Sequence, residues 1–320
     1  MPAPVRHPGS GGPPEPRDAP VLHVGPGERD DVRAAIEAGG GRVGPLEDAA
    51  GVVWLDHDPA ALPPLPESVR WVQLSSAGVE PWVRAGVVDG GRTFTSATGA
   101  YGSPVAEHAL ALMLAGAKAL PVFARSRSWD DSGRTTVGVL EGATVAIVGA
   151  GGIGRALIGL LEPFGAEILA VTRRGRAVPG AARTYAAGEI AEVWPLAHSI
   201  VIAAPATDGT RHLVGARELA AMREDARLIN VARGSLVDTD ALVDALREGA
   251  IAGAALDVTD PEPLPDGHPL WELPNVLITP HVATPPDAER RRFAERVREN
   301  VRRFAAGEPL EGVVDPESGY

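Results

Sequence analysis

The chain has 320 residues, of which 44% are hydrophobic and 22% charged, and this composition is that of a globular protein long enough for about two domains. Its formal net charge of −12 excludes a general binder of nucleic acid or of acidic membranes, because either partner requires a basic face. It contains no cysteine, which excludes disulfides, thiolate metal sites and cysteine nucleophiles and fits a reducing cytoplasm.

The first 20 residues are dominated by proline, glycine and charged side chains and lack the apolar stretch of a secretory signal. We therefore predict a disordered tail over residues 1–20 and a cytoplasmic protein. The most apolar long segment, residues 105–120, contains Glu107, His108 and Lys118 and is shorter than the roughly 20 apolar residues that span a bilayer. It predicts a buried helix, so we expect no membrane partner.

Short runs rich in valine and isoleucine alternate with helical patterns along the chain, which is typical of parallel α/β sheets. The expected strands are VLHVG (21–25), GVVWLD (51–56), RWVQLSS (70–76), TVAIVG (144–149), EILAVT (167–172), SIVIAAP (199–205), RLINVA (227–232), GAALDV (253–258) and VLITPH (276–281). The runs after residue 140 are apolar more continuously than those before it, as expected for strands buried on both faces. This difference indicates two sheets of different character.

Two further segments frame the expected strands. Residues 121–142 have neither a helical nor a strand period, and a loop of this length usually carries a function. Residues 286–310 predict an amphipathic helix, because apolar side chains recur at helical spacing on a charged background. These side chains are Phe293, Val297, Val301 and Phe304.

A glycine-rich motif stands directly after an apolar strand and at the head of a helical pattern. Gly149, Gly151 and Gly154 form G-x-G-x-x-G. The first glycine permits a tight turn, the second lets backbone approach a pyrophosphate, and the third allows close packing of helix on strand. The phosphates of a dinucleotide would rest at the helix N-terminus. We predict a dinucleotide site here and assign Gly152 and Ile153 to it as well.

The end of the next strand indicates which dinucleotide is bound. NAD binding calls for Asp or Glu about 20 residues after the glycines, to accept hydrogen bonds from the ribose hydroxyls. This position is Thr172, followed by Arg173 and Arg174. A hydroxyl and two guanidiniums can donate to a 2′-phosphate, which a carboxylate would repel. We therefore predict NADP(H) in preference to NAD(H). The alternative is that the two arginines form only a solvated turn.

Three polar residues of complementary chemistry follow apolar strands in the segment 222–283. Arg233, Glu262 and His281 each stand at a strand end or in the loop just after one. In an open parallel sheet these ends border the ligand crevice. A lone histidine or arginine is usually structural or solvated. The three together are candidates for a catalytic site, and we expect no metal.

The motifs and their order give the chain a specific resemblance over nearly its whole length after the tail. It resembles the D-isomer-specific 2-hydroxyacid dehydrogenases, the family of glyoxylate, hydroxypyruvate and D-lactate dehydrogenases. The matching pieces are VQLSSAGVE, ATGAYGSPVAEHALALMLA, VGAGGIGRAL, INVARGSLVDTDALVDAL, GAALDVTDPEPLP and TPHVA.

The resemblance implies a role for each candidate residue. Arg233 would clamp the carboxylate and carbonyl oxygen of a 2-oxo acid, since its fork can bind two oxygens. His281 would give a proton to the carbonyl oxygen while hydride arrives from the nicotinamide. Glu262 would pair with His281 and favour its protonated form. Asp257 would accept a hydrogen bond from the nicotinamide carboxamide.

The same resemblance implies further contacts on other loops. Backbone N–H groups at Ala77 and Gly78 would hold the substrate carboxylate, although this loop can equally be an ordinary strand-end turn. Pro205 and Thr207 would border the nicotinamide ribose and the adenine end of the cofactor. We also assign Ala232, beside Arg233, to the cofactor site.

The implied fold class is α/β, with two doubly wound parallel-sheet domains, Rossmann-like and flavodoxin-like, and an interdomain cleft. The substrate-binding domain would comprise residues 21–102 and 286–320 and is therefore discontinuous. The Rossmann domain that binds the dinucleotide would comprise residues 103–285. Segment 105–142, with its arm near Trp129, would form a homodimer contact.

The resulting prediction is an NAD(P)-dependent oxidoreductase that interconverts a small 2-oxo acid and a D-2-hydroxy acid, similar to glyoxylate and hydroxypyruvate reductases. Glu262 disfavours a formate dehydrogenase, in which the resemblance calls for glutamine. An enzyme similar to 3-phosphoglycerate dehydrogenase is one alternative, although the chain lacks the regulatory domain that many of those enzymes carry. A cofactor-sensing corepressor or scaffold is the other, and the Arg233, Glu262 and His281 set argues against it.

Overall fold

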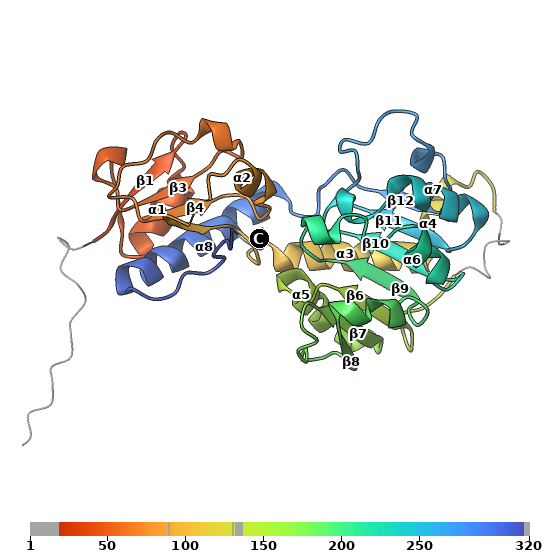
Figure 1. The fold of residues 1–320 in the computed structure, drawn as a ribbon. Coiled ribbons are helices and arrows are strands. Elements are labelled where there is room, and N and C mark those ends of the chain that lie inside the picture. The colour runs from red at the N-terminus through yellow and green to blue at the C-terminus, as the bar shows by residue number, and fades with distance from the viewer. Residues whose placement is uncertain (1–18, 89, 130, 132–136, 317–320) are drawn as a thin grey trace, which may run out of the picture. The chain divides into compact units, whose positions relative to one another are not determined.

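The structure is a computed structural model, and it describes residues 19–88, 90–129, 131 and 137–316 (Figure 1). Residues 1–18 of the predicted tail lie outside this part of the chain. The described chain divides into two units. Unit 1 contains the residues up to Ser76 together with Pro81–Ala97 and Phe293–Val314, and unit 2 contains Ala77–Glu80, Thr98–Arg292 and the residues from Asp315.

Unit 1 is built on a five-stranded sheet with the order β2-β1-β3-β4-β5. All of its strand pairs are parallel. The strands are β1 (Val21–Gly25), β2 (Arg42–Val43), β3 (Gly51–Trp54), β4 (Trp71–Leu74) and β5 (Thr93–Thr95). The order reverses at β1, which is the flavodoxin-like form of a doubly wound sheet.

The C-terminal helix packs on this small sheet. Unit 1 contains α1 (Asp30–Ala38), most of α2 (Glu80–Arg84) and the part of α8 (Pro286–Ala306) from Phe293 onward. The ring centroids of Trp71 on β4 and Phe304 on α8 lie 5.2 Å apart. The buried Asn300 donates from Nδ2 to Oε1 of the buried Gln73, at 2.8 Å. These contacts explain why the predicted amphipathic helix belongs with strands more than 200 residues earlier.

Unit 2 is built on a seven-stranded sheet with the order β12-β11-β10-β9-β6-β7-β8, again with every pair parallel. The strands are β6 (Thr144–Val148), β7 (Glu167–Thr172), β8 (Arg183–Ala186), β9 (Ser199–Ile202), β10 (Arg227–Asn230), β11 (Gly253–Leu256) and β12 (Val276–Ile278). The order reverses between β6 and β9, as in a Rossmann fold. The predicted fold class of two doubly wound parallel sheets is confirmed.

Both faces of the larger sheet are covered, which accounts for its continuously apolar strands. Along β6, Ala146 and Val148 join one hydrophobic cluster, whereas Val145 and Ile147 join the other. The first cluster includes side chains of α6 (Ala216–Ala221) and α7 (Thr239–Glu248). The second includes side chains of α3 (Gly102–Ala117) and α5 (Gly152–Leu161). No helix in the described part of the chain is long and apolar enough to cross a membrane.

Two segments differ from the sequence-based expectations. The helix predicted over 105–120 is α3, which ends at Ala117, and Ala119 has a left-handed φ of 51° that separates it from the next helix. That helix, α4 (Leu120–Arg125), occupies the start of a segment predicted to have no helical period. The pattern was misleading because Pro121 stands in the first turn, where proline fits a helix well.

Candidate functional site

The glycine motif forms the turn between β6 and α5, at the point where the strand order of unit 2 reverses. Gly149 has a φ of +101°, and a Cβ atom there would lie 2.5 Å from the carbonyl oxygen of Ala203 on the loop after β9. A Cβ atom on Gly154 would lie 2.3 Å from the carbonyl oxygen of Gly149. A Cβ atom on Gly151 would meet nothing within 4 Å. The first and third glycines are therefore needed for packing, whereas the second faces open space.

The end of β7 carries the three residues predicted to select the cofactor. Arg173 and Arg174 are exposed. The Thr172 hydroxyl is buried and has no hydrogen-bond partner among the described residues. Its contact with a 2′-phosphate stays a prediction, and the two exposed guanidiniums are the most accessible donors of the set.

The loop after β9 holds Pro205 and Thr207. Thr210 Oγ1 donates to the carbonyl oxygen of Pro205 at 2.8 Å, and the N–H of Thr207 donates to Thr210 Oγ1 at 2.8 Å. These hydrogen bonds hold the loop in place. The loop follows β9, which pairs with β6 on the side away from β7. Because β6 and β9 are adjacent parallel strands, the glycine turn and this loop emerge at the same sheet edge.

Arg233 follows β10 at the same edge and contacts the turn that contains Gly78. Its Nη1 donates to the carbonyl oxygen of Ala232 at 2.7 Å, and its Nε lies 3.4 Å from Oε1 of Glu80. A Cβ atom at position 78 would collide with Nη2, so a side chain there would displace the guanidinium from its present position. Buried Asn230 shapes the strand end by donating from Nδ2 to the carbonyl oxygen of Arg233.

Glu262 and His281 follow the neighbouring strands β11 and β12 and meet as a pair. The Nδ1 atom of His281 lies 2.7 Å from Oε1 of Glu262. Because a carboxylate is an acceptor, this contact places a proton on Nδ1 and leaves Nε2 as the second exchangeable position. Both side chains are roughly half exposed. His281 has a φ of 53°, a backbone conformation that few residues other than glycine adopt.

Asp257 lies behind this pair, at the end of β11, and its side chain is only 2% exposed. Its Oδ1 accepts from Thr279 Oγ1 at 2.6 Å and from the N–H of Val282 at 3.0 Å, and its Oδ2 accepts from the N–H of Ala283 at 3.2 Å. The hydrogen bond expected from a carboxamide stays a prediction. The carboxylate is engaged with the loop that carries His281.

Sequence reasoning missed three residues that this arrangement includes. Two of them are Glu80, beside Arg233, which ends the motif VQLSSAGVE, and Thr279, beside Asp257, which begins the motif TPHVA. His108 on α3 lies 2.9 Å, through Nε2, from Thr279 Oγ1, although the two are 171 residues apart in sequence. No local signal in the sequence indicates a contact over that separation. Among the described residues, no group of three or more His, Asp or Glu side chains is arranged to hold a metal ion.

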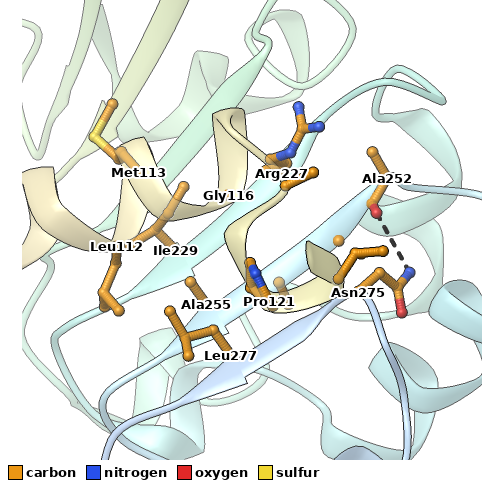
Figure 2. A pocket seen from close by; sticks show the side chains of 14 residues that line it. Leu112, Met113, Gly116, Pro121, Arg227, Ile229, Ala252, Ala255, Asn275 and Leu277 are labelled. Carbon is orange, nitrogen blue, oxygen red and sulfur yellow. Dashed lines mark hydrogen bonds between the residues drawn. The ribbon is translucent and has the colours of Figure 1, made fainter. Parts of the chain in front are cut away.

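A pocket of about 210 Å³ is lined by none of the predicted site residues. Figure 2 shows the side chains that line it. It lies between α3, α4 and the strands β10, β11 and β12, and apolar side chains make up most of its lining. Among them are Leu112, Met113, Ile229 and Leu277. Arg227 and Asn275 are its polar lining residues, and Asn275 donates from Nδ2 to the carbonyl oxygen of Ala252 at 3.3 Å.

The chain is similar in sequence to a known family and to known proteins. Residues 109–283 match the sequence profile of the D-isomer specific 2-hydroxyacid dehydrogenase NAD binding domain. An uncharacterized protein from the proB 3′ region of Corynebacterium melassecola is 41% identical over 295 residues, which is 91% of this chain and 97% of that protein. Glyoxylate reductase from Aeropyrum pernix is 49% identical over 113 residues, about a third of each chain (35% and 34%).

A solved structure is similar to this chain over nearly its whole length. The D-isomer specific 2-hydroxyacid dehydrogenase from Xanthobacter autotrophicus, in complex with NADPH and MES, is 29% identical and has a TM-score of 0.80. The alignment covers 94% of this chain and 100% of that one.

Proposed function

The chain belongs to the D-isomer specific 2-hydroxyacid dehydrogenase family, whose members are NAD(P)-dependent oxidoreductases, and we propose that it reduces a small 2-oxo acid with NADPH to the D-2-hydroxy acid. The observation that carries this proposal is the contact of 2.7 Å between Glu262 and His281 in the unit that also holds the glycine motif. A carboxylate that holds one imidazole nitrogen leaves the other free to exchange a proton with a substrate.

Each residue of the set has a separate task in this reaction. When bound at the glycine turn, the reduced nicotinamide would supply the hydride for the carbonyl carbon. Arg233 binds the substrate carboxylate, and backbone N–H groups of the turn at Ala77 and Gly78 assist it. His281 gives the proton on Nε2 to the carbonyl oxygen. Glu262 holds the Nδ1 proton and stabilises the charged imidazolium before transfer.

The glycine turn fits a dinucleotide. The open space at Gly151 leaves the backbone accessible at the N-terminus of α5, where N–H groups and the helix dipole favour a pyrophosphate. We assign Gly149, Gly152, Ile153 and Gly154 to the same pyrophosphate site. The loops after β9 and β10 complete the cofactor site with Pro205, Thr207 and Ala232. Residues 103–285 then form the cofactor domain, and residues 21–102 with 286–320 form the substrate domain.

Two alanine substitutions in the turn should have opposite effects. Gly151→Ala adds a methyl group in open space, so the melting temperature should stay within about 2 °C while NADPH affinity falls at least about tenfold. Gly154→Ala forces a Cβ against the Gly149 carbonyl and should lower the free energy of unfolding by about 1–3 kcal/mol. Thermal melts and titration of NADPH fluorescence measure both. Unchanged NADPH affinity in a folded Gly151→Ala protein would place the pyrophosphate elsewhere.

The preference for NADPH is proposed from the end of β7. Arg173 and Arg174 are exposed there, and no carboxylate occurs among residues 172–176 to repel a 2′-phosphate. The Xanthobacter autotrophicus relative was solved with NADPH, which supports the proposal. Because the Thr172 hydroxyl is buried, we assign the discrimination to the arginines.

The double substitution Thr172→Asp with Arg173→Ser should reverse the cofactor preference. It removes a guanidinium and adds a carboxylate, so the ratio of kcat/KM for NADPH over NADH should fall by about 10²-fold, the effect of one or two hydrogen bonds to a charged group. Arg183→Ser is the control, because it removes an exposed arginine from the amino end of β8. If the ratio does not change in the double variant, the arginines form only a solvated turn.

The reaction is tested by following oxidation of reduced cofactor with glyoxylate, hydroxypyruvate, pyruvate, a bulkier aryl pyruvate and 3-phosphohydroxypyruvate. Turnover with the smaller acids supports the proposal, and the best substrate measures the size of the acid pocket. Turnover restricted to the phosphorylated acid favours the phosphoglycerate alternative. Binding of NADPH without turnover of any acid favours a cofactor-sensing role.

We also propose that the chain forms a homodimer through segment 105–142. Leu120, Val122, Trp129 and Val139 expose apolar side chains there, with Trp129 fully exposed. The proposal predicts that the double substitution Leu120→Asp with Val139→Asp converts a dimer to a monomer, because two charges would be buried without partners. Light scattering after size-exclusion chromatography measures the mass, with Leu196→Asp, an exposed site on another surface, as the control. A wild-type monomer would contradict the proposal.

A further inference from the structure

A polar network that ends on the buried Asp257 connects α3 to the loop that carries His281. The Nε2 atom of His108 lies 2.9 Å from Thr279 Oγ1 and 3.3 Å from Asp257 Oδ1. Thr279 Oγ1 in turn lies 2.6 Å from Asp257 Oδ1. All three residues belong to unit 2. None of the proposed catalytic tasks uses His108.

The directions of these hydrogen bonds follow from the donors available. Thr279 has one hydroxyl hydrogen and donates it to the Asp257 carboxylate, which can only accept. The hydroxyl oxygen therefore accepts from His108, and this requires a hydrogen on Nε2. His108 is thus the outermost donor of a chain of hydrogen bonds that ends on Asp257.

Asp257 holds the loop on both sides of His281. Its backbone carbonyl accepts from the N–H of His281 at 2.8 Å, and its carboxylate accepts from the N–H groups of Val282 and Ala283. The left-handed φ of His281 is costly for a residue with a side chain and persists only where the surroundings impose it. The orientation of the Asp257 carboxylate is therefore part of what holds the imidazole beside Glu262.

We propose that His108 is a positioning residue that fixes His281 through Thr279 and Asp257. The consequence for turnover rests on the proposed function, since it requires His281 to be the proton donor. The structural consequence does not, because the hydrogen bonds to Val282 and Ala283 exist whatever the reaction. Loss of the His108 donor leaves Thr279 and Asp257 free to reorient and loosens both amide contacts.

Replacement of His108 by a smaller side chain should not create a cavity in a hydrophobic core. The His108 ring borders a pocket of about 330 Å³ that also contacts Val282, Ala283, Arg291 and Glu107. A smaller or apolar side chain at position 108 therefore enlarges an existing pocket and should leave the protein folded. Glu107→Gln alters the same wall but not the network, so it is the matched control.

The first test is hydrogen–deuterium exchange of the peptide that contains residues 276–285. His108→Leu removes the donor and should speed exchange at Val282 and Ala283 by about 3- to 10-fold, the value of one lost hydrogen bond. His108→Gln can donate from its amide nitrogen and should restore slow exchange, and Glu107→Gln should match the wild type. Unchanged exchange in a folded His108→Leu protein, with melting temperature as the check, would overturn the proposal.

The second test is steady-state kinetics with the acid that the wild-type enzyme reduces best. His108→Leu should lower kcat by about tenfold while the KM for NADPH stays within about twofold, and His108→Gln should recover most of kcat. If exchange becomes faster but kcat does not change, the position of the loop does not limit proton transfer by His281. That result would overturn the proposed effect of His108 on turnover. Absence of turnover in the wild-type protein would contradict the proposed function, and the exchange experiment would still decide the role of His108 in the loop.

Discussion

Replacement of His281 by alanine should lower kcat by about 10²- to 10⁴-fold while the affinity for NADPH changes by less than about threefold. The size of the loss follows from the task proposed for the imidazole, which would give a proton from Nε2 while Glu262, 2.7 Å from Nδ1, holds the ring. Without the imidazole, water must protonate the developing alkoxide. Turnover at saturating substrate and fluorescence titration of NADPH measure the two quantities separately.

Two control variants separate chemistry from backbone effects. His212→Ala removes another part-exposed histidine of unit 2 with a positive φ, 50° against 53° for His281, and should leave kcat within about twofold. Glu262→Gln keeps a hydrogen-bond acceptor but removes the charge that favours the imidazolium, so kcat should fall by less than in His281→Ala. If His281→Ala turns over within threefold of the wild type, another group supplies the proton.

The central strands could be predicted from the sequence because both of their faces are buried. Along β6 and β9, consecutive apolar residues enter opposite hydrophobic clusters, so the runs are continuous. Three of the four edge strands, β2, β5 and β8, were not predicted in this way, whereas β12 was. The strand β2 consists of Arg42 and Val43, and β8 has the sequence RTYA, and neither has enough buried side chains to produce a pattern.

The candidate site residues could be proposed from strand ends and motif order, but the contacts between them could not be predicted. Glu262 and His281 are 19 residues apart in the loops that follow the adjacent strands β11 and β12, and the pairing of these strands together with the course of both loops brings them into contact. The buried position of the Thr172 hydroxyl depends on the local pleat of β7. His108 reaches Thr279 because α3 packs under the sheet, a tertiary contact that no local periodicity encodes.

Arg233 should be the second position with a large effect, and its loss should damage both substrate binding and turnover. Arg233→Ala removes a forked donor to the substrate carboxylate, so kcat/KM should fall by about 10²- to 10³-fold, equivalent to about 3–4 kcal/mol. Arg233→Lys keeps the charge but offers a point donor, and should recover only part of this. Steady-state kinetics over a wide range of substrate concentration measure both variants.

Glu80 allows a second test of the role of Arg233, because its Oε1 lies 3.4 Å from Arg233 Nε. The Glu80 carboxylate contacts the guanidinium that is to receive the carboxylate of the substrate. Glu80→Gln alone should therefore lower the substrate KM severalfold. In the absence of Arg233, the Glu80 carboxylate has lost its partner and repels the substrate, so Glu80→Gln should rescue part of the Arg233→Ala defect.

The double-mutant cycle distinguishes this arrangement from a structural ion pair. If the pair only stabilises the fold, both single variants should lower the melting temperature, and Glu80→Gln should not improve the KM. If Arg233 is the anion clamp, the melting temperature should change little, since both side chains are about a third exposed and such pairs contribute about 0–1 kcal/mol. Substrate affinity should then vary in opposite directions in the two single variants, because the two side chains act on the same carboxylate with opposite charge.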